Sequence, residues 1–107
     1  MTAQEFDIVV ENRLALITKI LLTKRAEYAP EGGDRLHNFN RAAAMLGTTP
    51  EKALVGMLAK HLVSLLDIVD NIETKPPSVP LLEEKIGDAV NYLILLEGMI
   101  KGRLNDK

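Results

Sequence analysis

The residues best suited to chemistry lie on one stripe of the segment 83–97, which the sequence predicts to be helical. Glu84, Asp88 and Asn91 are spaced by four and three residues, so they share one helix face. Two carboxylates one turn apart supply the oxygen ligands that Mg²⁺ or Mn²⁺ prefers, and the amide would orient water or a ligand. The alternative is a solvated face, because the stripe lies opposite an apolar row.

A second polar stripe is predicted on the preceding helix, with spacings of four, three and four. Its members are Lys60, Ser64, Asp67 and Asn71. If the two stripes face each other across a cleft, Asp67 would orient water and Lys60 would contact phosphate directly. If they do not, this stripe is a second solvated face. The neighbouring His61 is either a ligand contact or a partly buried, hydrogen-bonded histidine.

A candidate anion site lies further toward the N-terminus. Lys24 and Tyr28 are one turn apart near the predicted end of the first helix, and Asp34 and Asn38 belong to the loop and helix that follow. Lys24 together with loop amides could hold a phosphate, since backbone N–H groups and helix N-termini favour anions. Ordinary helix capping and loop solvation are the alternative.

Composition excludes several classes of function. A chain of 107 residues is expected to form a single domain, 1–107, and a net charge of −2 without a basic run argues against a nucleic-acid surface. The absence of cysteine excludes disulfides, thiol catalysis and thiolate zinc sites. No apolar run approaches the roughly 20 residues of a membrane span. No signal peptide is recognised at the N-terminus, so we expect a cytoplasmic protein.

Periodicity and capping residues position these stripes on four predicted helices. The expected ranges are about 3–27, 34–46, 49–72 and 79–100. Gly47 is a natural terminator for the second helix, and the prolines of 73–80 separate the third helix from the last. We expect residues 101–107 to fray.

The expected fold is therefore all-α, a helical bundle of three long helices and one short helix. Only 4% of the residues are aromatic, so its core must be built mainly of aliphatic side chains. The segment from Val90 to Leu96 is apolar nearly all round, which predicts burial on most sides. Three helices cannot cover it, so we expect a homodimer or a higher homo-oligomer to complete the bundle.

Four stretches of the sequence resemble a known group of helical proteins. They are K-x-x-x-Y at Lys24–Tyr28, GGDRLHNF at Gly32–Phe39, AKHLVSLLD at Ala59–Asp67 and EKIGDAVNYL at Glu84–Leu93. Over residues 20–100 the chain resembles small phage and prophage proteins of the nucleotide-modification-associated type. More distantly it is similar to the MazG-like all-α NTP pyrophosphatases.

This resemblance implies Mg²⁺-dependent hydrolysis of a nucleoside triphosphate to the monophosphate and pyrophosphate. The family's later E-x-x-D motif is matched in part, because Asp88 fits but Lys85 stands three residues before it and Glu84 is displaced by one. The family's first motif, E-x-x-E, is missing. The resemblance nominates Asp88, Glu84 and Asp67 for catalysis, with Glu84 and Asp88 holding metal.

Three interpretations follow from these residues. The first is a pyrophosphatase-like enzyme, and the second is a nucleotide- or anion-binding protein without turnover. Lys60 favours the second, since a cation binds phosphate without metal. The third is a structural or partner-binding helical oligomer, which the apolar segment favours.

Overall fold

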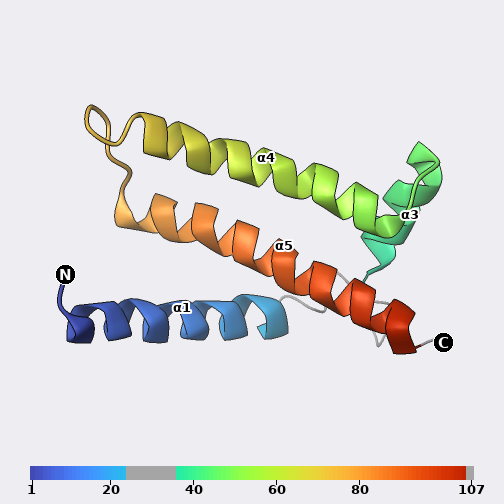
Figure 1. Cartoon of the computed structure of the whole chain (residues 1–107), viewed down its shortest axis with the longest axis horizontal. Coiled ribbons are helices and arrows are strands. Elements are labelled where there is room, and N and C mark those ends of the chain that lie inside the picture. Colours follow the sequence, from blue (N-terminus) through green and yellow to red (C-terminus); the bar gives the residue numbers. More distant parts are fainter. Residues whose placement is uncertain (24–35, 106–107) are drawn as a thin grey trace.

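The computed structural model describes residues 1–23 and 36–105, and this part of the chain contains four helices and no strand (Figure 1). The helices are α1 (Ala3–Thr23), α3 (His37–Leu46), α4 (Pro50–Asp70) and α5 (Val79–Asn105). The predicted all-α fold with three long helices and one short helix is confirmed. None of the described helices is both long enough and apolar enough to span a membrane.

The helix α5 is the central element of the arrangement. The helices α4 and α5 form an antiparallel hairpin, α1 lies along the other side of α5, and α3 packs against the start of α4 (Figure 1). The molecule measures 45 × 27 × 26 Å. It is therefore elongated along the hairpin, and one side of α5 faces α4 while another faces α1.

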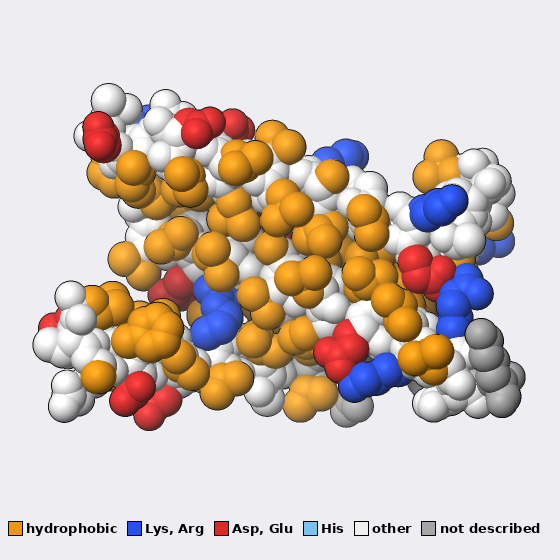
Figure 2. Space-filling model, viewed as in Figure 1, with side chains coloured by type: hydrophobic (Ala, Val, Ile, Leu, Met, Phe, Trp, Pro, Cys, Tyr) orange, Lys and Arg blue, Asp and Glu red, His pale blue; other side chains and the backbone are white. Residues whose placement is uncertain are grey.

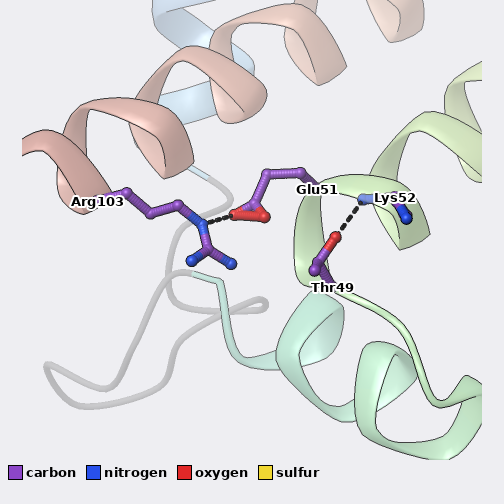
Figure 3. Close-up of polar contacts among 4 residues, drawn as sticks. All are labelled: Thr49, Glu51, Lys52 and Arg103. Atoms are coloured by element: carbon purple, nitrogen blue, oxygen red, sulfur yellow. Dashed lines mark hydrogen bonds and ion pairs between the residues drawn. The ribbon is translucent and has the colours of Figure 1, made fainter.

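Local chemistry explains where the helices begin. At α1, the Thr2 N–H donates to Glu5 Oε2 and the Glu5 N–H donates to Thr2 Oγ1, both at 3.1 Å, which is a capping box. At α4, Thr49 Oγ1 accepts from the Lys52 N–H at 3.3 Å (Figure 3). Pro50 occupies the first turn of this helix. At α5, Ser78 Oγ accepts from the Leu81 N–H at 3.2 Å.

A glycine ends α3, as the sequence predicts. Gly47 adopts the left-handed conformation with φ 66°, which an L side chain rarely adopts. The turn lets the N–H groups of Gly47 and Thr48 donate to the carbonyls of Ala44 and Ala43. The chain thereby reverses into α4 with only a short connection.

The core lies at the end of the hairpin where α3, α4 and α5 meet. Phe39, Leu54 and Met99 are buried together there, one from each helix. Leu54 is fully buried. Partly buried side chains that pack around this cluster are Leu36, Met57, Tyr92, Leu95 and Leu96. As expected, aliphatic residues dominate this core.

Within one chain the segment from Val90 to Leu96 is only partly covered, and its burial in an oligomer stays a prediction. Leu93 is 53% exposed and Ile94 is 38% exposed. The reason is geometric, because α4 and α1 cover only two sides of α5 and leave a third side open. The apolar row Leu82, Ile86, Ala89, Leu93, Leu96 and Ile100 of the same helix is likewise only partly covered.

The C-terminal end of α5 is more ordered than the sequence suggests, since residues 101–105 continue the helix. Arg103 Nε donates to Glu51 Oε1 at 2.6 Å and joins this end of α5 to the first turn of α4 (Figure 3). The hydrogen bond from Arg103 lowers the pKa of Glu51 and raises that of Arg103.

We predict that Glu51→Gln lowers the melting temperature by a few degrees at most near pH 7, because the Arg103 side of the ion pair is exposed to water. The pKa of Glu51 is lower in the folded chain than in the unfolded chain. Its contribution to stability is therefore present above the unfolded pKa and is lost as the pH falls through the folded pKa. Thermal melts from pH 7 down to pH 3 should show the two proteins converging. Glu73→Gln, in the exposed α4–α5 connection, is the control, and an equal loss in that variant would contradict the assignment.

Candidate functional site

A pocket of about 620 Å³ opens where α1, α3 and α5 meet, and its size suits a small molecule. The residues that line it are Arg13, Leu16, Ile20 and Leu21 from α1, Asn38 and Phe39 from α3, Met57 from α4, and Pro80, Glu83, Glu84, Asp88, Asn91, Tyr92 and Leu95 from α5. Apolar side chains from α1 and α5 form much of the wall, and the polar groups come mainly from α5.

The predicted stripe on α5 lies on this pocket. Glu84 is exposed, Asp88 is half-buried and Asn91 is buried, so the stripe becomes less accessible along the helix. The spacing of four and three residues places all three side chains on the same face. The carboxylates therefore lie toward solvent and the amide lies deeper.

Asn91 is the most unusual of these residues. It is only 9% exposed, and its Oδ1 atom has no hydrogen-bond partner in the described part of the chain. A buried acceptor without a partner costs about 1–3 kcal/mol of stability. A ligand that donates a hydrogen bond to this oxygen would recover that free energy.

Arg13 is a charged residue of the pocket that sequence reasoning missed. Its Nη2 donates to the Glu83 carbonyl at 3.2 Å, which fixes the guanidinium against α5. Gly87 makes this approach possible, because a Cβ there would lie 2.9 Å from Arg13 Nη1. One feature of the sequence could have identified it. Arg13 lies three residues before Leu16 and seven before Ile20, so it shares a helix face with these apolar residues.

An aromatic cluster closes the side of the site toward α4. The rings of His61 and Tyr92 lie 4.8 Å apart, and Phe39 meets Tyr92 edge-to-face at 5.9 Å. His61 Nδ1 lies 3.6 Å from Asp88 Oδ2, which brings the two groups together as an ion pair when the histidine is protonated. His61 is thus partly buried, and it contacts the pocket through Asp88 and Tyr92.

The polar stripe on α4 is not part of this pocket. None of Lys60, Ser64, Asp67 and Asn71 lines it, and the wall opposite Glu84 and Asp88 is formed by α1. Ser64 and Asn71 instead donate to backbone carbonyls of their own helix, those of Lys60 and Asp67. The candidates Lys24, Tyr28 and Asp34 lie outside the described residues, whereas Asn38 lines the pocket.

The described residues offer an incomplete set of metal ligands. Glu84 and Asp88 both line the pocket, but no group of three or more His, Asp or Glu within residues 1–23 and 36–105 is arranged to hold a metal ion. Asp67 does not join the other two carboxylates in such a group. We therefore derive no metal-dependent step from this arrangement.

Comparison with family models, curated proteins and solved structures finds no match to this chain. The resemblance to nucleotide-modification-associated proteins and MazG-like pyrophosphatases stays a prediction.

We predict that Gly98→Ala raises the free energy of unfolding by about 0.5–1 kcal/mol, because alanine favours a helix interior more than glycine does. Nothing lies within 4 Å of a Cβ at Gly98. Gly87→Ala should raise the free energy of unfolding by less, since the new methyl group displaces the Arg13 guanidinium. Denaturant unfolding of both variants checks this difference.

The Arg13→Met background supplies the matching control. Without the guanidinium, the two alanine substitutions should have the same effect, and the double-mutant cycle isolates the contact. If Gly87→Ala and Gly98→Ala raise the free energy of unfolding equally in the protein that keeps Arg13, the role given to Arg13 and Gly87 is contradicted.

Proposed function

We propose that the protein binds a nucleotide-like small molecule in the pocket between α1, α3 and α5. The proposal rests on Asn91, which lies on the wall of a pocket of about 620 Å³. Its side chain is buried, and its Oδ1 has no hydrogen-bond partner among the described residues. Pockets of this size with an apolar wall and a few polar groups are typical ligand sites.

The chemistry of the pocket favours a planar heterocycle. The side-chain amide of Asn91 offers an acceptor and a donor side by side, the pattern that pairs with the edge of an adenine ring. Phe39 and Tyr92 line the same pocket and provide aromatic surface for such a ring. Leu16, Ile20 and Leu95 exclude water from the ring faces.

The charged side chains of the pocket determine whether a ligand with phosphate groups can bind. Arg13 provides a cationic contact for a phosphate, whereas Glu84 and Asp88 repel one unless a cation lies between them. A nucleoside should therefore bind without metal, and a triphosphate should bind better with Mg²⁺. This difference separates recognition of the ring from recognition of the phosphates.

Hydrolysis of a nucleoside triphosphate is the second candidate function. It is favoured by one observation, that Glu84 and Asp88 line the same pocket as Asn91. Together with the partial E-x-x-D match, this arrangement makes Asp88 the residue to substitute in an assay for pyrophosphate release. The homodimer and the cytoplasmic location remain predictions.

We predict that adenosine raises the melting temperature of the protein and that ATP does so more strongly with Mg²⁺ than without it. Asn91→Leu should abolish both shifts, because leucine has a similar volume but no acceptor. The same variant without ligand should be more stable by about 1 kcal/mol or more, since the unpartnered oxygen is removed. A thermal-shift series with adenosine, ATP, and ATP with Mg²⁺ or Mn²⁺ measures these effects.

Asn12→Leu serves as the matched control, because Asn12 is an exposed amide on α1 outside the pocket. It should leave the ligand shifts unchanged. The proposal is wrong if the unaltered protein responds to none of these compounds, or if Asn91→Leu keeps the full response.

A further inference from the structure

An apolar face extends over three helices of the molecule. Large hydrophobic side chains gather on α4, α5 and α1 in the view of Figure 2. We define the apolar face by the exposed members that recur at helical spacing: Val55, Leu62, Leu66 and Val69 on α4, Leu82, Leu93, Ile100 and Leu104 on α5, and Phe6, Val10 and Leu14 on α1. Leu66 and Val69 are 60% and 63% exposed.

The apolar face lies on the opposite side of α5 from the ligand pocket. Asn91 lines the pocket and Leu93 belongs to the apolar face, and two residues along a helix turn the side chain by about 200°. The other pocket residues of α5, such as Asp88 and Leu95, repeat the position of Asn91 at helical spacing. On α5 the apolar face and the pocket therefore lie on different sides of the helix. On α1 they adjoin, because Leu14 of the apolar face and Leu21 of the pocket are seven residues apart and share a helix face.

The chain exposes more surface than a compact monomer of its mass. The chain exposes 8029 Å², whereas a folded monomer of 11.8 kDa is expected to expose about 5,900 Å². The difference, about 2,100 Å², exceeds the roughly 800 Å² that each partner buries in a standard interface and is of the size found in obligate homodimers. The radius of gyration, 16.2 Å, likewise exceeds the about 13 Å expected for this length.

The position of the core points to a permanent partner. The buried cluster of Phe39, Leu54 and Met99 lies at one end of the hairpin. The helix α1 and the half of the hairpin next to the α4–α5 connection contribute no residue to it. A partner that is present whenever the chain is made would stabilise that half, and a second copy meets this condition.

Charge on the apolar face is compatible with contact between identical surfaces. Glu97 lies one turn after Leu93 and pairs with Lys101 of the same helix, so the charges within this part of α5 cancel. The net charge of −2 gives only weak repulsion between two copies. No basic run offers attraction to an anionic membrane.

We propose that a second copy of this chain covers the apolar face and forms an isologous homodimer. In such a dimer the same patch of both copies meets across a two-fold axis. Leu93 and Leu66 lie in the buried centre, and α1 contributes through Phe6 and Leu14. This inference does not depend on what the pocket binds.

Sedimentation equilibrium over a wide range of protein concentrations tests the proposal. The expected mass is twice the 11.8 kDa of one chain. Leu66→Glu and Leu93→Glu should each shift the population to monomer, because a carboxylate in the centre of the contact loses its water. Met45→Glu is the control, since Met45 is 83% exposed on α3 and outside the apolar face. It should remain dimeric.

A second measurement covers the case in which a glutamate variant does not fold. The melting temperature of the unaltered protein should rise with protein concentration, as mass action requires of a dimer that dissociates on unfolding. Three results would overturn the proposal: a monomer at every concentration, a dimer that both glutamate variants preserve, or a monomer that instead binds phosphatidylcholine vesicles.

Discussion

The contact between α4 and α5 around Leu54 is the interaction on which the rest of the structure depends. Leu54 is fully buried between Phe39 of α3 and Met99 of α5, so one side chain joins three helices. The ion pair between Glu51 and Arg103 lies at the same end of the hairpin. Because this end is fixed, the orientation of α5 about its own axis is fixed as well. That orientation decides which residues reach the pocket and which reach solvent.

The helix α5 presents three different sides, and each has its own chemistry. One side packs on α4 through Met99 and the partly buried Leu96. A second carries Glu84, Asp88 and Asn91 to the pocket beside α1. The third carries the leucines of the apolar face. A single helix of 27 residues therefore links the candidate ligand site to the candidate dimer interface and places them on different sides of its own axis.

Features that depend on near neighbours in the sequence could be predicted. The capping box at Thr2 and Glu5, the cap at Thr49 and the left-handed turn at Gly47 each depend on residues within one helical turn. The helix order and the all-α class follow from these signals together with apolar spacing. The shared face of Glu84, Asp88 and Asn91 is also a local property, and the structure places all three on one pocket.

Features that depend on how the helices meet could not be predicted in the same way. The spacing on α4 resembles that on α5, yet only the α5 stripe reaches the pocket, because α1 rather than α4 forms the opposite wall. Arg13 and Gly87 are more than 70 residues apart in the chain, so their close approach has no local signal. Apolar spacing likewise identified the row on α5 but not which part of it lies outside the protomer. Such a row indicates that one side of the helix must be buried. Whether helices of the same chain or of another chain bury it depends on how many helices the chain itself supplies.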